Sequence, residues 1–214
     1  MKIEWLGHSA FRLEESTGTV VVTDPYDASI VGHDMPMTKA DIVTISHNHG
    51  DHNAVSRVTG DPVVLDEIGA YEIEGVHIAS LKSYHDKKKG AKRGENRVFT
   101  FGMDGVDICH MGDIGEECQL SFVEALGSVN VLLLPVGGKY TINAEEAKEY
   151  VDLIMPDIVI PMHYKTKDCE LDIDKVDDFL KLFDDEDIVE VEGNAIEFDR
   201  RFDNDSTKVV VFER

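Results

Sequence analysis

The stretch SHNHGDH, residues 46–52, holds three of the nine histidines of this 214-residue chain. His47 and His49 stand two positions apart at the end of a predicted strand, so their side chains can point to the same side. Asp51 and His52 fall in the turn that follows. Imidazole and carboxylate are ligands that zinc, manganese and iron accept. A histidine-rich surface loop is the alternative, but the spacing favours a metal site, and two adjacent cations over one.

The rest of the chain reads mainly as strands. Apolar β-branched or alternating runs between turn residues predict strands at IEWL (3–6), AFRLEE (10–15), TVVVTD (19–24), ADIVTIS (40–46), PVVLD (62–66), AYEIEG (70–75), VHIASLKSY (76–84), RVFTFGM (97–103), VDICHMG (106–112), VNVLLLPVG (129–137) and DIVIPMH (157–163), with a short β tail. Helices are predicted over 118–126, over 144–155 after the capping residue Asn143, and in the first half of the acidic stretch 168–192.

Strand-rich halves that are each closed by helices predict an α/β protein in which two sheets pack face to face with helices outside, a four-layer αββα sandwich. An apolar content of 42% supports a substantial buried core. No linker or low-complexity stretch divides the chain, which predicts a single domain over residues 1–214.

Composition also limits the compartment and the partners. The N-terminus lacks a secretory signal and no apolar run approaches membrane-spanning length, so we expect a cytoplasmic protein with no membrane partner. Cys109, Cys118 and Cys169 form no C-x-x-C pair, which predicts reduced structural thiols. The net charge of −22 argues against nucleic acid and favours a small molecule as the partner. A homo-oligomer is left open.

Further metal ligands are expected where other strands end. His85 closes VHIASLKSYH, Asp113 follows VDICHMG, and His163 closes DIVIPMH. Open α/β architectures gather their sites where strands run out into loops. These three residues can therefore complete a two-metal site begun by SHNHGDH.

Several of these elements together resemble the metallo-β-lactamase superfamily. They are HNHGDH, the strand-ending Asp24 in VVTDPY, Gly112-Asp113 after a strand, and His163 in PMHY. The opening IEWLGHSAF and the stretch LLPVGGKYTINAEEA further resemble its branch of metal-dependent hydrolases related to ascorbate-6-phosphate lactonase. The match runs in the family's order from about residue 1 to residue 167, and the HxHxDH element is highly specific.

The resemblance implies a ligand set and a reaction. It assigns His47, His49 and His85 to a first metal, Asp51, His52 and His163 to a second, and Asp113 to a bridge between them. Asp24 would orient a ligand histidine from behind, and Asp51 would serve catalysis as well as metal binding. Two divalent ions, zinc before manganese or iron, would share a hydroxide that attacks a lactone, ester or related bond in a small anionic substrate.

The third histidine of the first metal is the least determined ligand. His85 and His110 both fit, and His77 lies in the same strand run as His85. We favour His85, because it leaves its strand toward a loop while His110 precedes Asp113 by only three residues. His110 then becomes an acid–base catalyst or a residue behind a ligand. His8 in GHSAF also matches the branch and is expected at the rim of the metal site or in a plain turn.

Basic residues follow His85 directly in SYHDKKKGAKRGENR, namely Lys87, Lys88, Lys89, Lys92, Arg93 and Arg97. We expect this loop to overhang the site and to attract a phosphate or carboxylate, although a solvated loop has the same composition. The Gly-rich turn 137–141 lies between a strand and a helix, where Tyr140 can donate a hydrogen bond to a ligand. Substrate binding is thus predicted for Lys87, Lys88, Lys89 and Tyr140.

Three other functions are possible for a chain with this ligand pattern. A metal-dependent nuclease or phosphodiesterase shares the ligand pattern, but the acidic charge and the absence of an inserted arm oppose RNA binding. Diiron redox members replace the second histidine of the motif with glutamate, whereas position 49 is histidine here. A non-catalytic metal-binding protein is opposed by the completeness of the ligand set.

Overall fold

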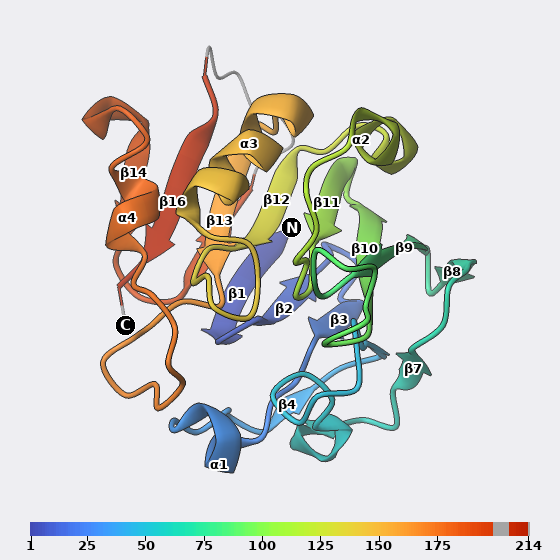
Figure 1. Cartoon of the computed structure of the whole chain (residues 1–214). Helices are drawn as coiled ribbons and strands as arrows, with labels where there is room; N and C mark the ends of the chain where they lie inside the picture. Colours follow the sequence, from blue (N-terminus) through green and yellow to red (C-terminus); the bar gives the residue numbers. More distant parts are fainter. Residues whose placement is uncertain (199–205, 214) are drawn as a thin grey trace.

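The computed structural model describes residues 1–198 and 206–213. In this part of the chain, two large β-sheets pack face to face (Figure 1). One sheet has six strands in the order β15-β1-β2-β3-β5-β7, and the other has eight in the order β14-β16-β13-β12-β11-β10-β9-β8. The strands are β1 Lys2–Gly7, β2 Ala10–Glu14, β3 Val20–Thr23, β4 Thr38–Lys39, β5 Ile42–Thr44, β6 Val58–Thr59, β7 Val63–Leu65, β8 Ala70–Ile73, β9 Val76–Tyr84, β10 Glu95–Met103, β11 Val106–His110, β12 Val131–Pro135, β13 Ile158–Met162, β14 Ile188–Val191, β15 Ala195–Glu197 and β16 Lys208–Phe212.

The main apolar core lies between the two sheets. Val21 of β3 and Ile42 of β5 belong to it together with Phe99 and Phe101 of β10. Successive residues of a strand point to opposite faces, so the neighbour Val22 instead enters a second apolar cluster on the outer face of the six-stranded sheet. Each such fully buried side chain contributes about 1.5–3 kcal/mol to folding.

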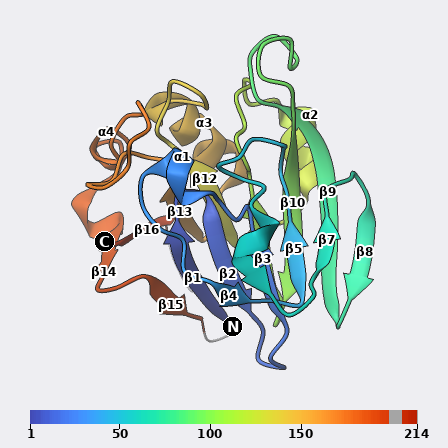
Figure 2. The same ribbon diagram turned by 90° about the horizontal axis from the view of Figure 1, so that it is seen from below.

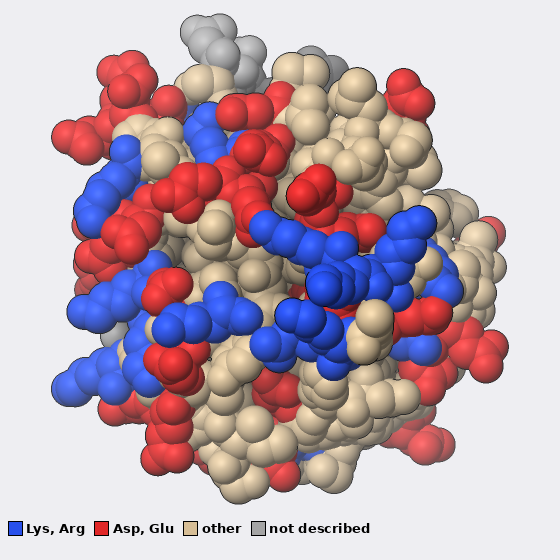
Figure 3. All heavy atoms as spheres, in the orientation of Figure 1, with Lys and Arg blue, Asp and Glu red and all other residues tan. Residues whose placement is uncertain are grey.

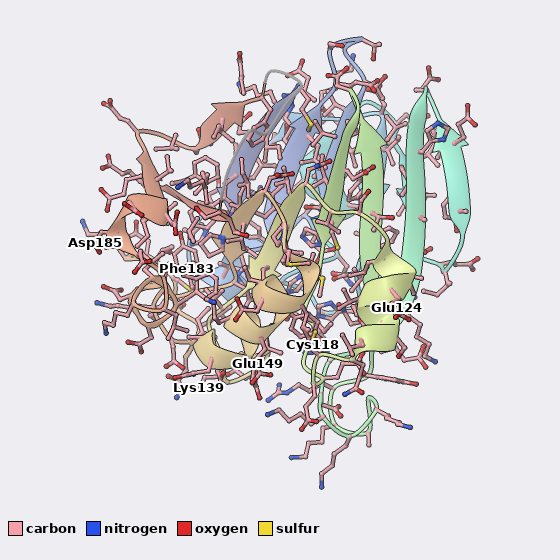
Figure 4. The ribbon with its side chains drawn as sticks, turned by 90° about the horizontal axis from the view of Figure 1, so that it is seen from above. Cys118, Glu124, Lys139, Glu149, Phe183 and Asp185 are labelled. Carbon is pink, nitrogen blue, oxygen red and sulfur yellow. The ribbon has the colours of Figure 1, made fainter. Side chains whose placement is uncertain are left out.

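Helices cover the outer face of the eight-stranded sheet, as Figure 4 shows for α2 (Leu120–Leu126) and α3 (Ala144–Ile154). The predicted capping residue Asn143 accepts the Glu146 N–H at 2.9 Å, and the Glu146 carboxylate accepts the Asn143 N–H at 3.1 Å. Two donors at the start of α3 are thereby satisfied reciprocally. Both helices were predicted, although α2 begins two residues later than expected.

The layer outside the six-stranded sheet is thinner. The single helical turn α1 (Ala28–Val31) and the loop residues Cys169 and Ile173 cover this face. The α/β sandwich predicted from the sequence is confirmed, but among the described residues its fourth layer consists of this turn, a 3-10 turn over Val55–Arg57, the two-stranded sheet β4-β6 and irregular segments.

The acidic stretch 168–192 is not the helix that its apolar spacing suggested. It contains one helical turn, α4 (Asp177–Leu180), a 3-10 turn over Asp185–Asp187 and the strand β14. Its first part is irregular because its backbone bonds to other segments: the Glu170 N–H donates to Val31 O, and the Asp174 N–H donates to Gly137 O. Repulsion between neighbouring carboxylates also disfavours a continuous helix.

Within residues 1–198 and 206–213, no helix is long and apolar enough to cross a lipid bilayer. All three cysteines are free, and Cys109 and Cys169 are buried.

Candidate metal centre

The polar residues singled out in the sequence meet along one edge of the two sheets. Strands β1, β3 and β5 run in one direction within their sheet, and β9, β11, β12 and β13 do so within theirs. The residues that follow these strands are His8 after β1, Asp24 after β3, the stretch 46–52 after β5, His85 after β9, Asp113 after β11 and His163 after β13. Parallel strands present their carboxyl ends at one edge, so residues distant in sequence converge there.

Three groups of side chains that could hold a metal ion form at this edge, and the third, Asp24, His47 and His52, shares its histidines with the other two. His47, His49 and His85 make the first group, and His8, Asp51, His52 and His163 make the second; within each group the ligand atoms lie within 4.8 Å of one another. The structure therefore brings together His85, not His110, with the two strand-ending histidines. It also groups His8, which is 2% exposed in the turn after β1, with the candidate ligands Asp51, His52 and His163.

Asp113 stands between the two groups. Its Oδ2 atom lies 3.3 Å from His85 Nε2 and 3.9 Å from His47 Nε2, which belong to the first group. The same oxygen lies 3.3 Å from His52 Nε2 and 3.2 Å from His163 Nε2, which belong to the second. One carboxylate oxygen thus faces the ligand nitrogens of both groups, as a bridging ligand must.

The donors of this centre fit divalent cations. Buried polar atoms without a hydrogen bond include His47 Nε2, His52 Nε2, Asp113 Oδ1 and both ring nitrogens of His8 and of His163. Each unsatisfied buried polar atom costs about 1–3 kcal/mol, and such atoms are normally rare. Their concentration around one point, in imidazole and carboxylate groups, is what a site for zinc, manganese or iron requires.

Most protonation states suit ligation. His52 is the exception: burial lowers its pKa, but Asp113 and Asp24 outweigh burial and hold that pKa well above its ordinary value, so this ring must release a proton to bind a metal. Burial lowers the pKa of His8 to about 4 and that of His47 to about 3, so both rings are neutral at pH 7. Burial raises the pKa of Asp113, but His163 and His52 outweigh it and hold that pKa well below its usual range. Burial likewise raises the pKa of Asp51, but the contacts with His8 and His52 outweigh it and hold that pKa well below its usual range. Neutral imidazoles and ionised carboxylates are the forms that bind metal.

Asp24 orients ligands of both groups, which the sequence predicted for one histidine. Its Oδ2 accepts from His52 Nδ1 at 2.8 Å and from the Ser46 hydroxyl, and its Oδ1 accepts the Ser46 N–H at 2.7 Å. Because the hydroxyl gives its one proton to Asp24, it must accept from His47 Nδ1, which is 2.9 Å away. Both histidines are thereby held with Nε2 free for a metal.

His110 has a different place from the acid–base catalyst that was considered. It is fully buried, its Nε2 donates to Ser9 O at 2.8 Å, and its Nδ1 accepts the Gly112 N–H at 3.2 Å. Both ring nitrogens are engaged with the backbone, so neither is available to exchange a proton with a substrate. We retain His110 as a residue that positions the segment before Asp113.

Asn96 is a supporting residue that sequence reasoning missed. It is fully buried at the start of β10, and its Oδ1 accepts the Asp113 N–H at 2.9 Å. Its Nδ2 donates to Ser83 Oγ at 2.7 Å and to Met111 O at 2.9 Å. A polar amide next to an apolar strand pattern was the only signal in the sequence, and it does not reveal these partners.

The basic loop that follows His85 is an ordered structure. Asp86 accepts hydrogen bonds from the backbone N–H groups of Lys88, Gly90, Lys92 and Arg93, at 2.7 to 3.2 Å. Figure 2 shows the loop projecting beyond β9 and β10. Figure 3 shows a group of lysine and arginine side chains right of the centre of the face, with further basic side chains among acidic ones at its left side.

The predicted substrate-binding residues differ in their side-chain contacts: some have a partner within the chain, and others are exposed. The Arg93 guanidinium lies 4.7 Å from the centre of the Tyr140 ring, so the loop meets the Gly-rich turn. Lys87 forms an ion pair with Glu146 of α3, which partly neutralises its charge, while Lys88 and Lys89 are exposed. Arg97 is not in the loop but in β10, where its Nη1 donates to Ser46 O at 3.1 Å. Substrate binding by Lys87, Lys88, Lys89 and Tyr140 stays a prediction.

The chain is similar to known proteins over most of its length. Residues 2–163 match the family model described as the beta-lactamase superfamily domain. A Staphylothermus marinus protein named a UPF0173 metal-dependent hydrolase is 32% identical over 194 residues, covering 77% of this chain and 83% of that protein. A Pyrococcus abyssi protein of the same name is 29% identical over 198 residues, covering 78% and 85%. The crystal structure of a Thermotoga maritima protein, named as a candidate Zn-dependent hydrolase of the metallo-beta-lactamase superfamily, is 40% identical with a TM-score of 0.82 and 99% of each chain covered.

Proposed function

We propose a function from the premise that this chain belongs to the metallo-β-lactamase superfamily and to its UPF0173 metal-dependent hydrolases. The chain hydrolyses a small anionic substrate, and two metal ions held by the chain take part in the reaction. The bond is a lactone, an ester or a related bond, in keeping with the resemblance of IEWLGHSAF to lactonase-like relatives. Zinc is the favoured metal, with manganese or iron as alternatives, because histidine and aspartate suit all three.

The observation that carries this proposal is the position of Asp113. Its Oδ2 lies between 3.2 and 3.9 Å from ligand nitrogens of both donor groups. A mononuclear site needs only one group of donors, whereas two groups of three or more donors surround this oxygen. Two groups around one carboxylate therefore support a binuclear centre.

Divalent cations held there would supply hydroxide at neutral pH, by lowering the pKa of bound water to roughly 7, and would polarise the oxygen under attack. The chain itself supplies charge balance through Asp51 and Asp113, which are ionised in the fold. His49 is the exposed histidine of the centre, whereas His47 and His52 are buried. We infer that substrate approaches from the His49 side.

An anionic substrate is supported by the basic loop. Lys88, Lys89 and Lys92 are exposed, and among the described residues they form no ion pair. The Asp86 hydrogen bonds hold the loop in one conformation, so little ordering entropy is lost when an anion binds. Lysines and arginines in a fixed arrangement bind phosphate or carboxylate groups well.

Nucleic acid is not the proposed substrate, because a net charge of −22 repels a phosphate backbone over most of the surface. We expect no retention of transfer RNA or single-stranded DNA in a filter-binding assay at physiological salt. Strong retention would favour the nuclease alternative.

Metal analysis combined with a substrate screen tests the proposal. Wild-type protein and Asp51→Ala are assayed for bound metal and for hydrolysis of lactones, phosphodiesters and thioesters, with exposed His77→Ala as the control. We expect roughly two ions per chain in wild type and in His77→Ala, and one or none in Asp51→Ala, with hydrolysis lost in parallel. Unchanged metal content in Asp51→Ala would contradict the ligand assignment, and metal without turnover would favour a non-catalytic protein.

A further inference from the structure

His8 lies outside the HNHGDH motif, in the turn between β1 and β2, and its backbone is unusual. Its φ angle is 51°, in the left-handed region that few residues other than glycine adopt. Its carbonyl oxygen accepts hydrogen bonds from Trp5 Nε1 at 3.0 Å and from the His163 N–H at 3.2 Å. Such a conformation costs about 1–3 kcal/mol and persists only where surrounding contacts hold it.

Asp24 and His163 share this left-handed backbone, with φ angles of 39° and 52°. Like His8, each directly follows a strand and turns its side chain toward the centre. Strained residues cluster at functional sites. Since Asp24 orients ligands and His163 is a proposed ligand, the same backbone at His8 is consistent with a ligand-related role.

The side chain of His8 is buried among proposed ligands of the second group. Its Nε2 lies 3.3 Å from Asp51 Oδ2, and its ring centre lies 4.3 Å from that of His163 and 5.1 Å from that of His52. Neither ring nitrogen makes a hydrogen bond that satisfies it, although the residue is only 2% exposed. A merely structural histidine would have a protein partner, as His110 has for both of its nitrogens.

We propose that His8 is itself a metal ligand, the fourth protein donor of the second site beside Asp51, His52 and His163. This inference rests on the proposed metal centre. It makes the two sites unequal, because the first group has three donors and the second has four, with Asp113 added to each. Counting Asp113, the first site has four protein donors and the second has five, so the first has more room for an added water or substrate. The exchangeable position then belongs to the His47, His49 and His85 group, beside the exposed His49 and the start of the basic loop.

A role limited to orienting Asp51 is the alternative, and His8→Gln separates the two. Glutamine has an N–H donor that can still reach Asp51, but it lacks the imidazole that zinc and cobalt prefer. His8→Ala removes both functions. The exposed His77, whose side chain is 72% exposed, provides the control His77→Ala.

The test measures metal binding in the full-length protein, not activity. Metal-free wild type and the three variants are titrated with Zn²⁺ against a chelator, and with Co²⁺ while the visible spectrum is recorded. We expect two ions per chain in wild type and in His77→Ala. In His8→Gln and His8→Ala we expect the second ion to bind more than ~100-fold more weakly, beyond the usual effect of losing an outer hydrogen-bond partner, with an altered Co²⁺ spectrum.

Wild-type affinity for the second ion and an unchanged Co²⁺ spectrum in His8→Gln would overturn the role of His8 alone. A wild type that binds no divalent cation would overturn the metal centre and His8 together. Near-ultraviolet circular dichroism verifies that each variant is folded, and His8→Gln, which is similar in size, decides the outcome if His8→Ala does not fold.

Discussion

Gly137 lies directly against the backbone carbonyl of His163, so closely that a Cβ atom at position 137 would overlap the carbonyl oxygen. Gly115 approaches His85 in the same way, because a Cβ there would stand 2.6 Å from both the carbonyl carbon and the carbonyl oxygen of His85. Two proposed metal ligands from the eight-stranded sheet are therefore each backed by a glycine from a neighbouring loop. The absence of a side chain at these positions lets the loops close onto the ligand backbones.

We expect Gly137→Ala to displace His163 and to destabilise the protein by about 1–3 kcal/mol, the usual cost of overpacking. Urea unfolding gives the free energy, and metal titration reports the displaced ligand. Gly102→Ala is the matched control, since its Cβ would make only ordinary contacts, the nearest at 3.6 Å. Equal metal affinity in the two variants would show that the contact with His163 does not position the ligand.

Ser46→Ala should weaken metal binding although Ser46 is not a ligand. The substitution removes the hydroxyl that connects Asp24 to His47 Nδ1, and loss of such a partner typically costs 10–100-fold in affinity. Isothermal titration with Zn²⁺ measures the change. Ser9→Ala serves as the control, because the buried Ser9 hydroxyl has no hydrogen bond in the described structure. A similar affinity in both variants would mean that the link through Ser46 has no effect on the ligands.

Asp86→Ala should release the basic loop. The variant loses the carboxylate that accepts backbone N–H groups from Lys88, Gly90, Lys92 and Arg93. Trypsin cleaves after lysine and arginine in mobile segments, so we expect rapid cleavage within 87–93 in the variant and slow cleavage in wild type. Glu95→Ala, which removes only a side-chain ion pair with Lys82, should behave like wild type.

Acid should release the same loop. Burial raises the pKa of Asp86, but the four backbone N–H groups outweigh it and place that pKa below its ordinary value of 3.8. A carboxyl group with a lowered pKa in the fold contributes stability that is present above its unfolded pKa and is lost as pH falls through the lowered value. In nuclear magnetic resonance spectra, we expect the backbone amide signals of Lys88 and Arg93 to keep their chemical shifts at pH 5 and to move only below about pH 3.8. Signals already shifted at pH 5 would contradict the role of Asp86.

Substitution of Lys87, Lys88 and Lys89 by glutamine should raise the KM for the anionic substrate found in the screen, most strongly at low ionic strength, and leave kcat nearly unchanged. The reason is that exposed charges attract an anion at long range and are screened by salt. Lys181→Gln, which changes an exposed lysine of the acidic stretch, is the control. An unchanged KM at low salt would remove the support for substrate binding by this loop.

Much of the fold and of the site follows from local patterns. Period-two runs mark the strands, and the convergence of His85, Asp113 and His163 could be expected because each directly follows such a run. His8 lies in a turn, one of the two placements considered, but the inward direction of its side chain was not expected, because the sequence around it does not specify the left-handed backbone at this position. Asn96 was missed because its three partners come from the strand β9 and from the segment after β11, which become neighbours of β10 only when the eight-stranded sheet forms. The acidic stretch was expected to contain more helix, because spacing alone does not report the bonds that Glu170 and Asp174 make elsewhere.

The donors of the metal centre are divided between the two sheets, and this division has a consequence for synthesis of the protein. The six-stranded sheet and its loops supply His8, His47, His49, Asp51 and His52, whereas the loops of the eight-stranded sheet supply His85, Asp113 and His163. About half the chain length separates His49 from His163. A ribosome therefore exposes the motif HNHGDH long before its last partner emerges, and such long-range contacts form late in folding. Full metal affinity is acquired only when both sheets have docked, so metal uptake marks the completed chain rather than the nascent one.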